Sequence, residues 1–440
     1  MMTQQAETVV GEFTSLSRTS LRRQPLLLAY FWLLLFSVVN FARPEDWIPG
    51  LTRIPLAKIT GILAFVALVF TIGKVRHRYA REMIYLFLLF GQLCLTVPFS
   101  PIWRGGAFQG VLDFSKVVVI GIVMLLVVRT TIRLRYLLFV QAASVAIVAV
   151  VSVWKRGYLS GRLQGVLNGN YGNPNDLALC IVVSLPLCLV FLFGSRSRLR
   201  KTVWAAAIAV MTYAVFLTSS RAGLLSLIVV VSVCLWEFAI RGRRRYLVAV
   251  VAIAAVVFSV YAANGVVGRL SAKDESASES AQQRRELLIK SLNVTAQHPL
   301  FGIGPGNFTV VSGNWHVSHN SYTQMSSEGG IPALVLYLLI LSRGFTNVRS
   351  VKRMTRNGGE LKMFASALRA SLAGFVVGSF FASEAYQFLT YFLVFYTTIL
   401  YHMALRRWLA DNRTDNADSG TYAQQETETV MSEQPAWSTY

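Results

Sequence analysis

The sequence has few charged residues, and most of them carry the same sign. Only 14% of its 440 residues are charged, whereas 54% are hydrophobic, and the mean hydropathy is +0.50. A soluble domain carries roughly 25% charged residues, so this chain lacks the polar surface that such a domain needs. The composition therefore excludes a water-soluble globular protein and indicates a membrane protein.

Cysteine and histidine are also scarce, with four and five copies. All four cysteines lie in apolar runs, so we expect small buried side chains rather than a disulfide framework. His316 and His319 have a spacing that suits a shared metal ion, but no cysteine or well-placed carboxylate completes a set of three or four ligands. We therefore predict no metal site and no cofactor.

Long apolar runs recur along nearly the whole chain. A membrane-spanning helix needs about 20 mostly apolar residues, and the connections between most of these runs are short. The pattern predicts an all-α polytopic membrane protein with about twelve transmembrane helices. The predicted spans are 26–41, 54–73, 83–99, 111–128, 134–154, 176–194, 202–218, 222–239, 246–264, 329–345, 365–383 and 385–404.

The positive charges indicate how the chain is oriented. Lys and Arg number 42 against 21 Asp and Glu, and most of them fall in alternate connections such as 74–81, 196–201 and 241–245. Because positive loops stay in the cytoplasm during insertion, we predict that both termini are cytoplasmic, in the inner membrane of a bacterium. The net charge of +21 then reflects topology, and we predict no nucleic acid partner.

This topology divides the chain into segments of different character. Residues 1–25 form a cytoplasmic N-terminal segment, and 26–264 contain spans one to nine. Residues 265–328 form one long periplasmic loop between spans nine and ten, and 329–404 contain the last three spans. The remaining residues, 405–440, are polar and rich in Thr, Glu, Gln and Ser, which predicts a disordered cytoplasmic tail.

The long loop 265–328 is the most informative part of the sequence. Loops of such length in compact domains are usually functional or disordered, and this one shows signs of order. Its middle, 282–297, mixes leucines with arginines and predicts an amphipathic helix near the membrane surface. A segment rich in glycine and proline follows at 298–308, and then Ser318-His319-Asn320-Ser321-Tyr322 leads to the tenth span.

Arginines on the predicted outer face suit an anionic ligand. Arg162 opens a polar loop, Arg221 separates two spans that otherwise form one apolar stretch, and Arg284 and Arg285 lie in the amphipathic helix. A guanidinium keeps its charge and binds phosphate oxygens in pairs, and charges at membrane depth are functional candidates. Structural alternatives remain open: Arg221 as a topogenic charge and Arg285 on a solvated helix face.

Two further residues have structural as well as functional interpretations. Asp176 follows Pro174 at the start of a predicted span, so we expect it to be a helix N-cap. His319 either caps or packs a loop helix, or it acts as a base, because a histidine has its pKa close to ambient pH. Glu328 and Glu384 stand at outer span ends, where either could orient an arginine or His319.

Taken in order, these pieces resemble the O-antigen ligase and O-antigen polymerase superfamily of bacterial membrane glycosyltransferases. Each motif alone is weak, but their order and shared face make the set specific. The motifs are Gly172-Asn173-Pro174-Asn175-Asp176-Leu177-Ala178, Ser220-Arg221-Ala222-Gly223, Arg284-Arg285-Glu286-Leu287-Leu288, His298-Pro299-Leu300-Phe301-Gly302-Ile303-Gly304-Pro305-Gly306-Asn307-Phe308, His319-Asn320-Ser321-Tyr322 and Glu328-Gly329-Gly330.

The resemblance implies a metal-independent membrane glycosyltransferase. Members take a glycan from undecaprenyl diphosphate and attach it to an acceptor hydroxyl, such as that of a lipid A core sugar. The resemblance implies that Arg221 and Arg285 bind the diphosphate, with Arg284 as an alternative register for Arg285 and Arg162 as a further candidate. It implies His319 as the catalytic residue. The family often shows an aromatic residue shortly after this arginine, whereas Leu288 and Ile289 follow here.

Three other functions remain alternatives at this point. A polysaccharide polymerase and a protein O-oligosaccharyltransferase of the same superfamily differ from a ligase only in the acceptor. A transporter of lipid-linked glycan or polysaccharide belongs to another class and also has about twelve spans. Transporters often show repeated halves and polar sites at mid-membrane, whereas the polar residues here gather on one face, which favours chemistry at the membrane surface.

Overall fold

The computed structural model describes residues 26–48, 50–51, 53–71, 80–155, 158–159, 162–165, 171–238, 274–313, 315–355 and 358–432. The predicted N-terminal segment 1–25 and the predicted ninth span 246–264 lie outside these ranges. Apart from one two-residue hairpin, all regular elements within them are helices. The α-helices are α2 (Leu27–Ala42), α3 (Pro44–Trp47), α4 (Leu56–Val69), α5 (Arg81–Phe99), α6 (Arg104–Val127), α7 (Thr131–Lys155), α8 (Pro174–Gly194), α9 (Arg198–Leu217), α10 (Arg221–Glu237), α12 (Asp274–Gln297), α13 (Phe308–Ser312), α14 (Ser321–Met354), α15 (Glu360–Gly378) and α16 (Phe388–Ser432).

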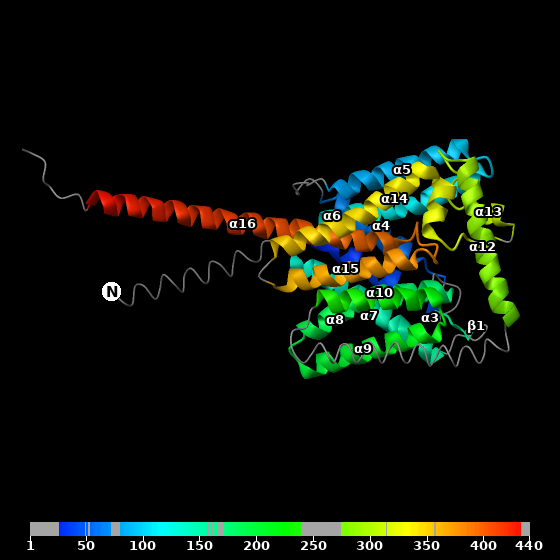
Figure 1. The fold of residues 1–440 in the computed structure, drawn as a ribbon, viewed down its shortest axis with the longest axis horizontal. Coiled ribbons are helices and arrows are strands. Elements are labelled where there is room, and N and C mark those ends of the chain that lie inside the picture. The colour runs from blue at the N-terminus through cyan, green and yellow to red at the C-terminus, as the bar shows by residue number, and fades with distance from the viewer. Residues whose placement is uncertain are drawn as a thin grey trace, which may run out of the picture.

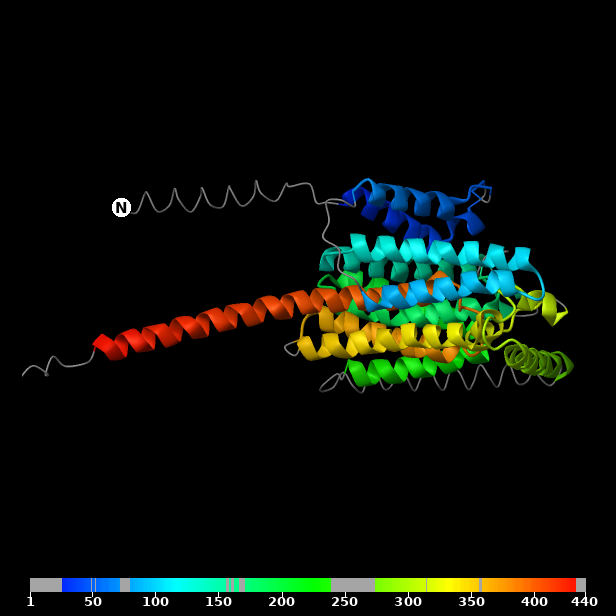
Figure 2. The same cartoon turned by 90° about the horizontal axis from the view of Figure 1, so that it is seen from above.

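The long helices run side by side in one bundle (Figures 1 and 2). Eight of the described helices are long and apolar enough to cross a membrane, and α2 and α4 are shorter apolar helices. The predicted all-α polytopic membrane fold is therefore confirmed, while the number of twelve spans stays a prediction. Figure 1 shows that α12 lies across one end of the bundle, at a steep angle to the other helices. We call this end the site end.

Small residues let the central helices approach closely. In α15, a Cβ on Gly374 would lie 2.3 Å from the Cγ2 of Val230 in α10, and one on Gly378 would lie 2.3 Å from the Cδ1 of Leu179 in α8. Helices in membranes associate through such close van der Waals contact, because lipid offers them no hydrophobic driving force. The α8, α10 and α15 trio therefore forms a tightly packed centre that holds the helix ends in place.

The predicted bounds of several spans differ from the helix ends, among them the bounds of the last three spans. The tenth span, predicted as 329–345, is part of a longer helix: α14 begins at Ser321 and ends at Met354. Within it, Gly330 has a φ of 80° and a ψ of 174°, and Pro332 follows. The kink at Gly330 separates a short helix at the site end from the span itself. Because prolines and glycines usually mark helix ends in a sequence, the sequence does not predict that the helix continues through this kink.

The other two boundary errors concern the last two helices. The eleventh span, predicted as 365–383, is the helix Glu360–Gly378. The last helix continues past the predicted span end at 404 to Ser432, while the cytoplasmic, disordered tail from residue 405 stays a prediction. The tail contains Gln, Glu and Ala, which have good helix propensity, so its composition does not oppose extension of the span.

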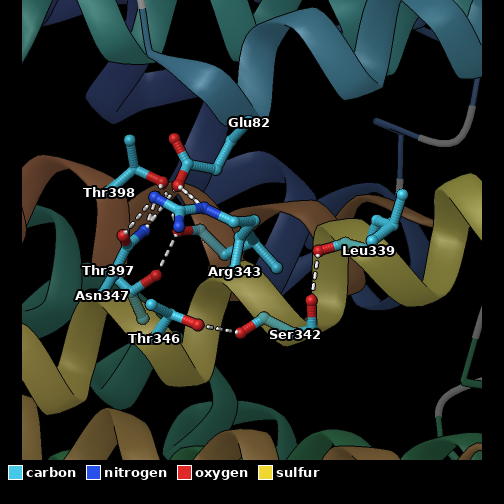
Figure 3. A network of polar contacts seen from close by, with 9 residues as sticks. Glu82, Leu339, Ser342, Arg343, Thr346, Asn347, Thr397 and Thr398 are labelled. Atoms are coloured by element: carbon cyan, nitrogen blue, oxygen red, sulfur yellow. Dashed lines mark hydrogen bonds and ion pairs between the residues drawn. The ribbon is translucent and has the colours of Figure 1, made fainter.

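Buried polar clusters fasten the helices near the other end of the bundle. In Figure 3, the Arg343 Nε of α14 donates to the Glu82 Oε1 of α5 at 3.1 Å, and the Asn347 Nδ2 donates to the same oxygen at 2.9 Å. Asn347 also donates to the Thr398 hydroxyl of α16 at 3.3 Å. Arg343 is therefore a structural residue inside α14, where it joins α5 to α14.

A second cluster joins α10, α14 and α15. The carboxylate of Glu237, which is fully buried, accepts from Arg369 at 2.7 Å and from the Ser366 hydroxyl at 2.9 Å, and it also pairs with Lys352. Because a buried carboxylate is costly unless it is paired, Lys352 and Arg369 have a structural role here that does not depend on membrane topology.

Candidate functional site

The site is built at the end of the bundle where α12 lies. The connections from α7 to α8, from α9 to α10 and from α15 to α16 meet there with the segment 298–320 (Figure 1). In the sequence these segments are spread between residues 156 and 387, with whole helices between them. The bundle therefore brings the predicted outer-face motifs to one surface.

Helix α12 is seated on the bundle through one of its faces. Leu287, Ser291 and Val294, spaced four and three residues apart, are buried, and Leu287 and Val294 pack with Ile303 and Phe308 in a small separate core. Arg284 lies one turn before Leu287, so its side chain belongs to the same face. By contrast, the side chains of Leu288, Ile289 and Leu292 are 37%, 47% and 51% exposed.

The turn-rich segment after α12 is wedged against the kink of α14. The Ile303 and Gly304 amides donate to the Ser327 and Glu328 carbonyls at 2.9 and 2.8 Å. At Gly302, with a φ of 64°, a Cβ would lie 2.5 Å from the carbonyl carbon of Glu328. Glycine is required here for both the left-handed backbone and the close approach. The segment 298–308, rich in glycine and proline, is thus a fixed support for the start of α14 at Ser321.

Glu328 has a structural contact rather than a place among the arginines. Its Oε1 accepts from the Phe308 amide at 3.1 Å, at the start of α13. Next to it, the Asn307 amide group donates to the Ser100 hydroxyl and to the Trp103 and Ile303 carbonyls at 2.8–3.0 Å. These contacts tie the segment 298–308 to the end of α5 and the start of α6.

Arg162 is held by the start of α8 and the end of α9. It lies in strand β2 (Arg162–Leu163), which pairs with β1 (Tyr158–Leu159) in a short antiparallel hairpin. Its Nε donates to the Thr218 carbonyl at 3.0 Å, and one terminal nitrogen donates to the Asn175 side-chain oxygen at 3.1 Å. These two hydrogen bonds therefore fix the orientation of the Arg162 guanidinium group.

The same Asn175 oxygen also positions the start of α10. It accepts from the Ser220 hydroxyl at 2.7 Å, and that hydroxyl accepts from the Gly223 amide at 3.0 Å as the N-cap of α10. Ser219, with a φ of 49°, turns the chain sharply before the cap. Arg221, the first residue of α10, is consequently exposed at the helix N-terminus. Asn173, not Asp176, caps α8, so the N-cap predicted at Asp176 is wrong.

His319 lies in a tight turn that is tied to the connection between α15 and α16. Its φ is 52°, and the next residue, Asn320, caps α14 by accepting from the Tyr322 and Thr323 amides. The Ser321 hydroxyl donates to the Ala382 carbonyl at 2.7 Å and accepts from the Glu384 amide at 2.9 Å. Since Asn320 performs the capping, His319 is not the cap that the structural alternative assumed.

Electrostatic effects show which of these groups are neighbours. Burial, then the Arg284 guanidinium, then His316 lower the pKa of His319 from 6.5 to about 4. Burial and then Arg284 lower the pKa of Arg162. Burial lowers the pKa of Arg284 itself, Arg221 lowers it further, and Asp176 opposes them. Arg162, Arg221, Arg284 and His319 thus form one group, which we call the arginine–histidine cluster.

The cluster combines positive charge with an imidazole that is neutral near neutral pH. Within the described part of the chain, none of its three arginines forms an ion pair with a carboxylate. Unpaired guanidiniums at a partly buried site are suited to an anion that carries several oxygens, and diphosphate is such an anion. The neutral imidazole can accept a proton from a hydroxyl.

Arg285 does not join the cluster. Its side chain is exposed, and no interaction between described residues involves it. Between the two registers left open by the sequence, the structure brings Arg284 to the other site residues. Arg285 projects from α12 beside Leu288 and Leu292, away from the face that packs on the bundle.

Glu384 is a buried acid at this site, and the sequence offers it only as a residue that could orient an arginine or His319. Burial raises its pKa well above the usual range, and Asp176 adds to the effect. Its position after α15, at the outer end of a span, is the only signal that the sequence offers. Across the described residues, no group of three or more His, Cys, Asp or Glu side chains lies together as metal ligands would.

Comparison with known proteins agrees with the motifs in the sequence. A family model described as O-Antigen ligase matches residues 206–338, a stretch that includes Arg221, Arg284 and His319 but not Arg162. No curated protein matches the chain in a sequence search. This match supports a place for the chain in the O-antigen ligase and polymerase superfamily, and the polytopic helical membrane fold agrees with it.

Proposed function

We propose that this protein is a glycan ligase that acts at the periplasmic face of a bacterial inner membrane. It transfers a glycan from undecaprenyl diphosphate to an acceptor hydroxyl on a lipid A core or a related glycan. The observation that carries this proposal is the arginine–histidine cluster at the site end of the bundle. Arg284 lies next to a neutral His319, and Arg162 and Arg221 lie next to Arg284.

The proposed step exchanges one bond for another at the anomeric carbon of the donor. The acceptor oxygen forms the new glycosidic bond, and the bond between the anomeric carbon and the diphosphate oxygen breaks. Undecaprenyl diphosphate leaves with the bonding electrons, and the hydroxyl proton passes to His319. Because diphosphate is a good leaving group, the main demand is to stabilise its developing charge, which positioned guanidiniums can do.

The geometry favours different tasks for the three arginines. Arg221 is exposed at the N-terminus of α10, where the helix dipole adds to its attraction for phosphate. Arg284 projects from the packed face of α12 toward Arg221 and His319. Arg162 is fixed by Asn175 and Thr218. We assign Arg221 and Arg284 to the diphosphate and Arg162 to a supporting position.

His319 suits the role of a general base. Its imidazole, with a pKa of about 4, is unprotonated throughout the neutral range, so it is ready to accept the hydroxyl proton. General base assistance of this kind contributes roughly 10²–10⁴-fold to a rate. The same pKa makes His319 a weaker base than a free histidine, which is consistent with a reaction driven mainly by departure of the diphosphate.

The deciding experiment is transfer by the purified protein in liposomes. The donor is a defined glycan on undecaprenyl diphosphate, offered with and without a lipid A core acceptor, and mass spectrometry follows the products. Glycosylated acceptor made by wild type and lost in His319→Ala supports the ligase. Longer lipid-linked chains that form without acceptor identify a polymerase instead. If neither product forms while the donor moves across the bilayer, the protein is a transporter.

Metal independence is part of the proposal and has its own test. The three guanidiniums supply the positive charge that a divalent cation supplies in many enzymes that act on phosphorylated substrates. We expect transfer to continue at an unchanged rate in excess EDTA. A loss that Mg²⁺ or Mn²⁺ restores would show that the arginines do not suffice.

A further inference from the structure

A second concentration of guanidinium groups lies at the end of the bundle opposite the site end. Arg129 follows directly after α6, and Arg406 lies in the last helix, α16. Burial lowers the pKa of Arg129, and the nearby guanidiniums of Arg406 and Arg133 lower it further. These like charges repel one another, so an anion among them would be stabilised.

The position of this charge is fixed by the surrounding structure. Arg133 is buried, donates to the Val127 carbonyl at 2.8 Å, and lies over the ring of Tyr30 with 5.1 Å between guanidinium carbon and ring centre. The Arg129 Nε donates to the Leu126 carbonyl at 2.8 Å. Hydrogen bonds to backbone carbonyls therefore hold both guanidiniums in place.

A cavity opens between the end of α6, where Arg129 lies, and α16. On one side it is lined by Leu125, Leu126 and Val128, and on the other by Ile399 and Met403. Arg129, His402 and Arg406 supply its polar part, and no acidic residue lines it. One region of the cavity is thus apolar, and the other carries two guanidiniums and an imidazole.

The cavity lies where the apolar part of the bundle ends. The span formed by α6 stops at Val127, and Arg129 is the first charged residue after it. Phospholipid headgroups lie at this level, next to the hydrocarbon core. Basic pockets between membrane helices are known to bind anionic headgroups, and the apolar side chains of this cavity can contact an acyl chain.

We propose that this cavity binds an anionic glycerophospholipid of the leaflet at that end. Its phosphate contacts Arg129 and Arg406, and the start of one acyl chain lies along Leu125, Leu126 and Met403. The site is separate from the arginine–histidine cluster, and it does not depend on the proposed transfer reaction.

The general excess of positive charge in cytoplasmic loops offers a simpler explanation for these arginines. That rule requires charge alone, and Arg198 and Arg200 satisfy it as exposed residues at the start of α9. It does not require a half-buried guanidinium beside a cavity with an apolar wall. Arg198 and Arg200 therefore make a matched control, with the same loss of charge and no cavity.

The test measures lipid binding to the full chain in detergent. Purified protein is titrated with phosphatidylglycerol, phosphatidylcholine or inorganic phosphate, and native mass spectrometry counts bound lipid while thermal unfolding is followed in parallel. The variants are Arg129→Gln/Arg406→Gln, the control Arg198→Gln/Arg200→Gln, and Arg406→Gln alone. Arg406 is exposed, so its single replacement keeps the test valid if the double variant does not fold.

We expect phosphatidylglycerol to bind wild type and the control at least about tenfold more tightly than it binds the cavity variants, since charge-assisted contacts to phosphate are lost. Phosphatidylcholine should bind all of them weakly. Equal binding of phosphatidylglycerol by wild type and Arg406→Gln, or equal loss in the control, overturns the proposal. Inorganic phosphate that stabilises the protein as well as the lipid does would also overturn it, because the apolar wall would then have no role.

Discussion

At the scale of single residues, two adjacent arginines in α12 differ only in the direction in which they project. Arg284 lies on the face of Leu287, which packs on the bundle, and Arg285 lies on the exposed face. The sequence could not decide between them, because α12 has two apolar stripes. Leu287 and Val294 form one, and Leu288, Ile289 and Leu292 form the other, so only the tertiary contacts reveal which stripe is buried.

This difference gives a matched pair of variants. Arg284→Gln should lower the rate of glycan transfer by about 10²-fold or more, since one of the donors that stabilise the leaving charge is lost. Arg285→Gln removes the same charge from the same helix and should stay within about threefold of wild type. The measurement is transfer from the lipid-linked donor at matched protein levels. A larger loss in Arg285→Gln would return the assignment to the register that the sequence first favoured.

The environment of His319 predicts the pH dependence of transfer. Burial and Arg284 lower its pKa to about 4, so the catalytically competent neutral form persists as the pH falls through the usual histidine range. The rate constant kcat/KM should therefore stay level from pH 8 to about 5 and fall only near 4, because this constant reports the free enzyme. An acid limb centred near 6.5 would show that His319 is solvated or is not the base.

At the scale of elements, the helices follow directly from the sequence, whereas their ends do not. Long apolar runs identified the spans within the described ranges, because burial in lipid requires them. The helix from Ser321 to the kink at Gly330 is polar in part and short, and it is helical because the segment 298–308 and the connection after α15 hold it. Such support comes from distant residues, so a local pattern could not show it.

The contact between the turn-rich segment and α14 depends on one glycine in particular. Gly302 and Gly306 both have positive φ, at 64° and 82°, but only a Cβ on Gly302 would meet other atoms, at 2.5 Å from the Glu328 carbonyl. Gly306→Ala should cost only the strain of its backbone, about 1–2 kcal/mol. Gly302→Ala should in addition displace the segment, lower the thermal unfolding temperature further and lose transfer. Equal effects of the two substitutions on both measurements would show that the close approach at Gly302 does not hold the segment 298–308 against α14.

The packing of α12 on the bundle can be tested with another matched pair of variants. Leu287 is 6% exposed and packs with Ile303 and Phe308, whereas Leu288 is 37% exposed. Leu287→Ala should cost about 2–5 kcal/mol of local stability, release α12 and reduce transfer, because Arg284 moves with the helix. Leu288→Ala should leave both unchanged. Hydrogen exchange across 282–297 measures the release, and equal protection in the two variants would show that the small core does not hold the helix.

At the scale of the whole molecule, the bundle separates two kinds of charge. Guanidiniums without carboxylate partners gather at the site end, while at the other end Glu82 and Glu237 pair with Arg343, Lys352 and Arg369. The sequence shows the excess of positive charge but not this division, since ion pairs between helices link residues far apart in the chain. The arginines of the cluster are therefore open to a ligand, whereas Arg343, Lys352 and Arg369 hold helices together at the other end.

The orientation of the bundle in the membrane can be tested directly. The insertion rule places the basic segment 196–201 in the cytoplasm, and therefore the site end in the periplasm. Val310 in α13 is 37% exposed and Leu199 at the start of α9 is 73% exposed, and neither is part of the cluster. In a Cys94→Ala background, a membrane-impermeant thiol reagent should label Val310→Cys in intact cells with a permeable outer membrane. It should label Leu199→Cys only after the inner membrane is disrupted. The opposite result would turn the arginine–histidine cluster toward the cytoplasm, where the proposed periplasmic transfer could not take place.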